Sequence, residues 1–152
     1  MCAGRSDFNG FYSARALTAS GRPWFEGAGE KNLYWDPDCD GGGTAAARWI
    51  FDVSEPSVIA ASDLDGDSNC MFAGSIDSSS ELPPSGPIIW SMRCPSSVED
   101  VSVTIADLAT CPAGQEPNMS SGGCSDCSEG KHSFFYGTDL CVPCPAGRYG
   151  SR

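Results

Sequence analysis

The chain has 152 residues, of which twenty are acidic and nine are basic, so its net charge is −11, and nine residues are cysteines. This charge excludes the basic surface that nucleic-acid binding needs, and it disfavours contact with anionic membranes. No apolar run approaches the length of a membrane span, so we expect no membrane insertion. The cysteine content is typical of oxidising compartments and predicts an extracellular or cell-surface location.

Short runs of β-type residues alternate with turn residues over the first two thirds of the chain. The clearest run is the last, in which Val101, Val103 and Ile105 alternate with small polar residues at the period of a half-buried strand. Glycine and proline clusters separate the runs and are not typical of helix interiors. The expected strands are, in chain order, Gly10–Leu17, Pro23–Glu26, Asn32–Trp35, Arg48–Val53, Val58–Ser62, Cys70–Phe72, Ile88–Cys94 and Val98–Ile105.

Large aromatic side chains fall in or beside these predicted strands. A small β-domain needs its largest side chains inside, so they predict the core of a small antiparallel β-sandwich or barrel. An exposed aromatic platform for a carbohydrate is the alternative, and the burial of the tryptophans separates the two interpretations. The aromatic residues concerned are Trp24, Trp35, Trp49, Trp90, Phe11, Tyr12, Tyr34 and Phe51.

The composition changes sharply near Leu108. Residues 1–107 hold sixteen acidic and six basic residues, whereas residues 108–152 hold four and three, together with five of the nine cysteines. This change predicts two domains, an acidic β-module over 1–107 and a cysteine-rich module over 108–152. We expect the second module to have little regular secondary structure.

A repeat organises the cysteine-rich module. Segments that begin at Cys124 and Cys141 both read C-x-x-C-x-x-G-[K/R], seventeen residues apart. The segment Cys111-Pro-Ala-Gly is the second half of an earlier copy, in which Leu108 replaces the first cysteine. Periodicity of this kind is typical of arrays in which each unit contacts its neighbours.

Two kinds of cross-link fit the repeat. Four cysteines in C-x2-C-x13-C-x2-C spacing fit a tetrahedral zinc site, but that interpretation leaves Cys111 and the Pro-Ala-Gly turns without a role. Disulfides between successive copies explain both, which predicts Cys111–Cys124 and Cys127–Cys141. This pairing leaves Cys144 unpaired in the last copy, so we expect its partner further along a longer chain, with the present sequence truncated in mid-repeat.

The segment from Cys141 to Tyr149, with its C-x-x-C-P-A-G-R-Y pattern, resembles the ephrin-receptor-like cysteine-rich repeat. The resemblance covers residues 108–152, and Leu108 departs from it. The preceding module resembles a small β-module that accompanies such repeats in extracellular proteins of microalgae and protists. It is carried by Asn9-Gly-Phe-Tyr, Gly21-Arg-Pro-Trp, Leu33-Tyr-Trp-Asp and Arg48-Trp-Ile. Both resemblances imply an extracellular scaffold or adhesive role and no catalytic residues.

Four cysteines remain, which allow three connectivities. We expect the disulfides Cys39–Cys70 and Cys2–Cys94.

The segment Asp36-x-Asp38-x-Asp40-Gly41 has the carboxylate spacing with which a calcium-binding loop begins. Position 12 of such a loop is Ala47, which offers no ligand. Asp and Gly are also ordinary turn residues, so a solvated turn is the alternative for this segment.

A second acidic cluster lies just before Cys70. A Cys39–Cys70 disulfide would bring both clusters into one neighbourhood, where a cation relieves the repulsion between carboxylates. Taken singly, each cluster is better explained as a solvated turn, and a shared calcium ion is the alternative that such a disulfide would favour. Calcium is the one cofactor that the sequence suggests. The expected ligands are Asp36, Asp38, Asp40, Asp63, Asp65 and Asp67.

The remaining motifs predict a protein without catalysis. His132 is the only histidine, and no G-x-S-x-G or H-E-x-x-H motif accompanies it. Asn118-Met-Ser is an N-glycosylation sequon, so we expect a glycan on Asn118.

These features predict an extracellular structural or adhesion protein, part of a larger cell-surface, matrix or filament-forming glycoprotein. Its expected partners are other extracellular proteins or copies of itself, and glycans. A calcium-dependent, lectin-like carbohydrate-binding module is the alternative.

Overall fold

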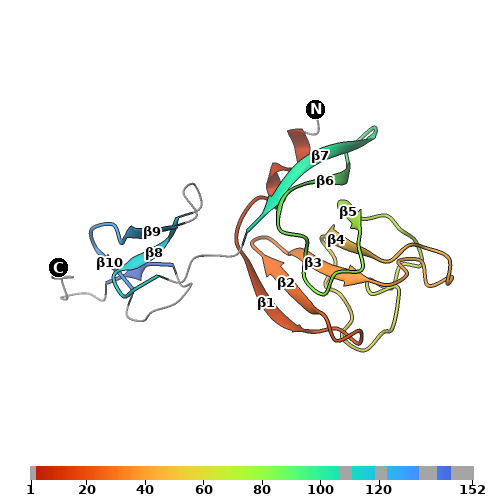
Figure 1. Ribbon diagram of the computed structural model, residues 1–152, viewed down its shortest axis with the longest axis horizontal. Coiled ribbons are helices and arrows are strands. Elements are labelled where there is room, and N and C mark those ends of the chain that lie inside the picture. The colour runs from red at the N-terminus through yellow and green to blue at the C-terminus, as the bar shows by residue number, and fades with distance from the viewer. Residues whose placement is uncertain (1–2, 107–110, 119–122, 134–139, 145–152) are drawn as a thin grey trace. The chain divides into compact units, whose positions relative to one another are not determined.

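The computed structural model describes residues 3–106, 111–118, 123–133 and 140–144 (Figure 1). The chain divides into two compact units, Met1–Ile105 and Ala106–Arg152, here named the N-terminal and C-terminal units. The expected mainly β architecture is confirmed. The N-terminal unit has one seven-stranded antiparallel sheet, and the C-terminal unit has two sheets of two strands each.

The N-terminal sheet is a single meander, in which each strand pairs with the next strand along the chain. All seven strands belong to this one sheet, in place of the two stacked sheets of a sandwich. A short 3-10 helix, η1 (Ala3–Phe8), precedes it. The strands are β1 (Tyr12–Leu17), β2 (Pro23–Gly27), β3 (Lys31–Asp36), β4 (Arg48–Asp52), β5 (Gly74–Asp77), β6 (Gly86–Arg93) and β7 (Val98–Ile105).

Two of the expected strands are wrong. The segment Val58–Ser62 belongs to the connection between β4 and β5, and Ile59 in it is 89 % exposed. The amides of Ile59 and Ala60 donate to the Ser57 hydroxyl, a local turn that competes with strand pairing. The segment Cys70–Phe72 is also irregular, and the strand β5 begins only at Gly74.

Both faces of the sheet are buried at its centre, because neighbouring side chains of a strand point to opposite sides. The first face carries a core that includes Trp35 and Trp49, and the second face carries a core that includes Tyr34 and Ile50. All four tryptophans are buried, which confirms the core interpretation. The first-face core consists of Phe8, Leu33, Trp35, Trp49, Phe51, Ala73, Trp90 and Met92, and the second-face core of Trp24, Tyr34, Cys39, Ile50 and Leu64.

Two long connections supply side chains to the second face. Cys39 comes from the β3–β4 connection and Leu64 from the β4–β5 connection, and both pack in the second-face core. A disulfide between Cys39 and Cys70 joins the two connections, with their Cα atoms 5.2 Å apart. The Asp63 amide adds a backbone hydrogen bond to the Asp38 carbonyl (3.0 Å). The two acidic loops are therefore held next to each other.

The C-terminal unit repeats one local structure. In both copies the amide of the residue after the turn glycine donates to a carbonyl three residues earlier, Gln115 to Pro112 (3.1 Å) and Lys131 to Ser128 (3.0 Å). The glycines of these turns, Gly114 and Gly130, both have positive φ. The short strands are β8 (Gln115–Asn118), β9 (Gly123–Asp126), β10 (Lys131–His132) and β11 (Val142–Pro143), paired β8–β9 and β10–β11.

Candidate cation site

Three of the four disulfides expected from the sequence are present in the structure. Cys111–Cys124 and Cys127–Cys141 link successive copies of the repeat across 13 and 14 residues, and Cys39–Cys70 lies in the N-terminal unit. The fourth expected pair, Cys2–Cys94, includes Cys2, which lies outside the described residues. Cys144 has no disulfide partner within the described part of the chain. Three disulfides indicate an oxidising, secretory environment.

Asp36 is the last residue of β3, and its side chain lies on the second face of the sheet. Each of its two carboxylate oxygens accepts a hydrogen bond. Its side chain is 1 % exposed. Oδ1 accepts the Asp38 amide (2.9 Å), and Oδ2 accepts the Leu64 amide from the other connection (2.8 Å). Asp36 therefore fastens both acidic loops to the end of the strand.

Asp38 and Asp40 organise the β3–β4 connection itself. The Asp38 carboxylate accepts the amides of Gly43 and Ala45, and the hydrogen bond from Gly43 is the main reason why the pKa of Asp38 is lowered. Asp40 accepts the Gly42 amide (2.8 Å). Both carboxylates thus have hydrogen bonds to their own loop, as expected of turn residues.

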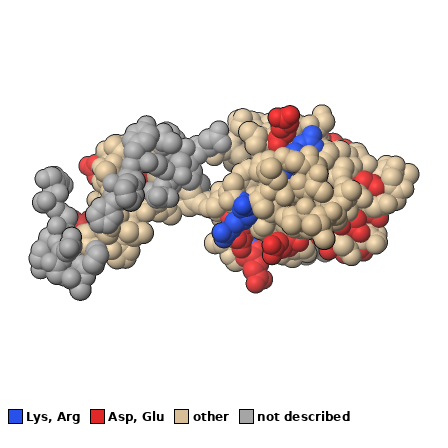
Figure 2. Space-filling view, turned by 90° about the horizontal axis from the view of Figure 1, so that it is seen from below, with Lys and Arg blue, Asp and Glu red and all other residues tan. Residues whose placement is uncertain are grey.

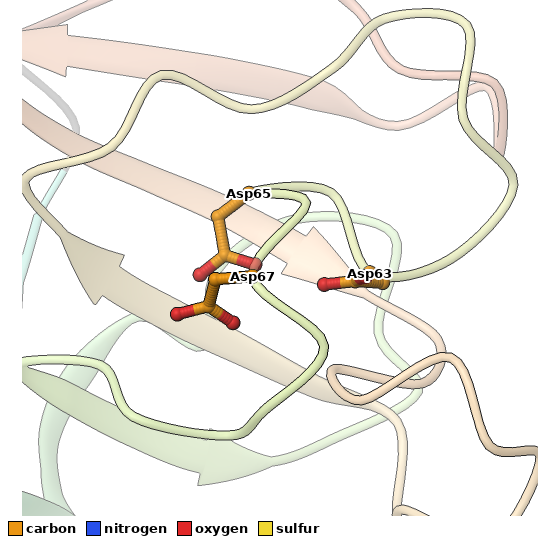
Figure 3. A group of neighbouring side chains, drawn as sticks. All are labelled: Asp63, Asp65 and Asp67. Atoms are coloured by element: carbon orange, nitrogen blue, oxygen red, sulfur yellow. The ribbon is translucent and has the colours of Figure 1, made fainter.

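The second acidic cluster is different, because its carboxylates face one another. Asp63, Asp65 and Asp67 each place one oxygen within 4.8 Å of the others, the only such group among the described residues. Figure 3 shows the Asp63 carboxylate directed toward Asp65 and Asp67, which lie side by side. The structure therefore does not gather the six expected ligands at one point. It groups three of them, of which Asp63 and Asp67 also accept amides of their own loop, those of Ser68 and Asn69. The other three lie outside this group, and each accepts amides of the two connections.

Among the described residues, no basic side chain balances the charges of this group. In the described part of the chain, no Lys, Arg or His forms an ion pair with Asp63, Asp65 or Asp67. Burial, and to a smaller extent the charge of Asp67, raise the pKa of Asp65 to about 7. Figure 2 shows how acidic side chains outnumber basic ones on the visible face of the N-terminal unit. A cation next to Asp65 would stabilise its ionised carboxylate and so lower its pKa again.

Asp52 is a further carboxylate within electrostatic reach of Asp65, and sequence reasoning did not include it. It ends β4, is 6 % exposed, and raises the pKa of Asp65 by its charge. One of its oxygens accepts the Ser54 amide (3.3 Å), and it has no ion pair among the described residues. The pairing of β3 with β4 places it on the second face, a register that the sequence alone does not reveal.

Tyr34 also reaches this region from the second face. Its side chain is fully buried, and its hydroxyl has no hydrogen-bond partner among the described residues. Burial raises the pKa of Tyr34, and nearby carboxylates raise it further, which places the hydroxyl within electrostatic reach of them. In decreasing order of effect, these carboxylates belong to Asp52, Asp65, Asp36 and Asp67.

Two other residues from the sequence analysis lie in the C-terminal unit. Asn118 is the last residue of β8, directly before a segment outside the described residues that contains the rest of its sequon. His132 lies in β10 and pairs in register with Val142.

Comparisons with protein-family models, with curated protein sequences and with solved structures return no match for this chain. Within the residues that the structure describes, no helix has the length and apolar character needed to cross a bilayer.

Proposed function

We propose that this chain belongs to an extracellular or cell-surface structural or adhesion protein and has no catalytic role. The observation that carries the proposal is the repeated, cross-linked unit at its C-terminal end. Both copies have the same glycine turn, and disulfides run from each copy to the next. An arrangement in which each unit is joined to its neighbour suits a structural array of repeats.

The interior of the C-terminal unit supports the same proposal. Its buried described residues are Cys111, Pro117 and Cys141, so cross-links replace the apolar core of an ordinary domain. Small modules of this kind are typical of extracellular proteins, in which disulfides persist. The resemblance to ephrin-receptor-like repeats favours the same class, with other extracellular proteins or further copies of this chain as partners.

The carbohydrate-binding alternative has less support. It requires tryptophans at the surface near the acidic loops, whereas Trp24, Trp35, Trp49 and Trp90 are all at most 9 % exposed. A glycan-binding platform on this chain would have to use smaller side chains.

The location is tested on intact source cells with a membrane-impermeant amine-labelling reagent. We expect the chain to be labelled and, in samples alkylated before lysis, to carry its disulfides. A cytosolic protein of the same cells serves as the control that must remain unlabelled. Recovery of the chain in the reduced cytosolic fraction would overturn the proposal.

The structural role is tested by extracting washed cell-surface or matrix material with detergent, with and without a reductant. We expect a large part of the chain to remain insoluble until disulfides are reduced, because a structural component is held in an assembly. Treatment with an N-glycosidase before mass measurement tests the glycan on Asn118 in the same material. Complete extraction as a monomer without reductant would contradict the structural role.

A further inference from the structure

We propose that Asp63, Asp65 and Asp67 bind a calcium ion beside the second-face core, in which Tyr34 packs with Leu64, the residue between Asp63 and Asp65. The proposal concerns a site that the structural role does not require. It also differs from the ligand set expected from the sequence, because Asp36, Asp38 and Asp40 lie outside the group of carboxylates whose oxygens are close together.

The separation of the carboxylates fits one ion of this size. Calcium–oxygen bonds are about 2.3–2.6 Å long, so two oxygens on opposite sides of one ion are about 5 Å apart. The oxygens of Asp63, Asp65 and Asp67 lie within 4.8 Å of one another, which is within this limit (Figure 3). This spacing is compatible with one ion shared by the three carboxylates.

The buried side of the site gives a second, independent indication of a ligand. The Tyr34 hydroxyl is fully enclosed and has no hydrogen-bond partner among the described residues, although buried hydroxyls ordinarily have one. A water molecule bound to the ion would donate a hydrogen bond to the Tyr34 oxygen. The same ion would compensate Asp52, which is buried at the end of β4 without an ion pair among the described residues.

The chemistry of the group favours calcium over other metals. All of its ligands are oxygens, which excludes a preference for the softer metals that cysteine and histidine bind. Magnesium requires a near-ideal octahedron and retains most of its water, whereas calcium accepts an irregular set of six to eight oxygens. Calcium sites in extracellular modules have dissociation constants of about 10⁻⁴–10⁻³ M, and we expect this range here.

The proposal is tested by calorimetric titration of the full, disulfide-bonded chain with calcium chloride at constant ionic strength. We expect one ion per chain. Asp65→Asn should weaken binding about tenfold, since the number of ligand charges sets the affinity of calcium sites. Tyr34→Phe should weaken it by a smaller factor. Asp40→Asn, in the adjacent loop but outside the group, should stay within about twofold of the original chain.

Folding of each variant is checked by its thiol count and circular dichroism. If Asp65→Asn does not fold, Asp67→Asn is used, because Asp67 is exposed and its loss leaves the core intact. The absence of saturable binding at 10 mM calcium, roughly ten times the weakest expected constant, would overturn the proposal. Equal weakening by Asp65→Asn and Asp40→Asn, or equal binding of magnesium, would overturn it as well.

Discussion

Asp36 and Asp40 belong to the same acidic segment, yet their side chains experience different surroundings. Asp36 is buried at the end of β3, where its carboxylate accepts amides from two separate connections. Asp40 accepts a single amide from its own exposed turn. Removal of the Asp36 carboxylate therefore leaves a buried amide, that of Leu64, and a partly buried amide, that of Asp38, without an acceptor. Removal of the Asp40 carboxylate leaves only an amide that water can reach.

We predict that Asp36→Ala lowers the free energy of unfolding by about 2 to 4 kcal/mol, because each stranded buried amide costs about 1–3 kcal/mol. Asp40→Ala should cost less than about 1 kcal/mol. Urea unfolding of both variants, followed by circular dichroism, measures the difference. Equal losses in the two variants would show that Asp36 has no special structural role.

Part of the candidate site was predictable from the residues alone. The spacing of Asp63, Asp65 and Asp67 identified a group of carboxylates that the structure does bring together. The contributions of Asp52 and Tyr34 depend on strand register and on which face of the sheet a side chain occupies. Neither property follows from local spacing, because a shift of one residue in register would move both side chains to the opposite face.

At the scale of elements, the Cys39–Cys70 disulfide determines whether the two connections stay over the second face. It spans 31 residues, and the connections that it joins contain no strand of their own within the described residues. Few regular backbone hydrogen bonds therefore hold them, and the cross-link replaces part of that missing support.

We predict that replacing both Cys39 and Cys70 by Ser lowers the free energy of unfolding by about 4 kcal/mol, the value of the chain-entropy model for a loop of this length. The replacement should also expose Leu64 and Tyr34, since both pack in the second-face core. Amide hydrogen exchange of the Leu64 amide, compared before and after the change, measures the loosening. Unchanged exchange there would contradict the proposed role of the cross-link.

The turn glycines of the C-terminal unit offer a matched pair of substitutions. Gly114 and Gly130 have φ values of +84° and +80°, and an added Cβ atom has no neighbour within 4 Å at either position. Substitution by Ala should therefore act through the backbone alone, at a cost of about 1–2 kcal/mol.

The Cys127 amide donates to the Gly114 carbonyl and the Cys144 amide to the Gly130 carbonyl, both at 2.8 Å. We predict that each Ala substitution accelerates hydrogen exchange of the amide that donates to that turn about fivefold to thirtyfold. This range is the backbone cost of about 1–2 kcal/mol expressed as a ratio of opening equilibria. Glu129→Ala, in the second turn, should change neither amide. Unequal responses would show that the two copies are not structurally equivalent.

The strands rich in aromatic or β-branched residues were predictable, and the strand without them was missed. Val98–Ile105 matches β7, because its apolar residues recur at every second position. Val58 and Ile59 also have high β propensity, but they are adjacent, so one strand could not turn both toward a core. β5 escaped prediction, because Gly74 and Ser75 carry little β signal, although both are buried between β4 and β6.

At the scale of the whole molecule, the two units rely on different sources of stability. The N-terminal unit has two apolar cores, whereas the described interior of the C-terminal unit is largely made of disulfides. A reductant should therefore affect them unequally, since cross-links mainly restrict the unfolded chain.

We predict that a strong reductant unfolds the C-terminal unit under conditions in which the N-terminal sheet persists. Limited trypsin digestion should then cut after Lys131 rapidly, while Arg48, which pairs with Asp77 at 3.5 Å, stays protected. Mass measurement of the fragments identifies the sites. Simultaneous cleavage in both units would mean that the sheet depends on Cys39–Cys70 as strongly as the repeats depend on their cross-links.

All four tryptophans lie in the N-terminal unit, at most 9 % exposed, and the indole groups of Trp35 and Trp49 donate to the carbonyls of Ser78 and Ser80. Indole emission from this protein should accordingly be blue-shifted and insensitive to iodide, and it reports on the sheet alone. Loss of the repeats would leave that emission unchanged. Tryptophan fluorescence therefore monitors the folding of the N-terminal unit and is insensitive to the folding of the C-terminal unit.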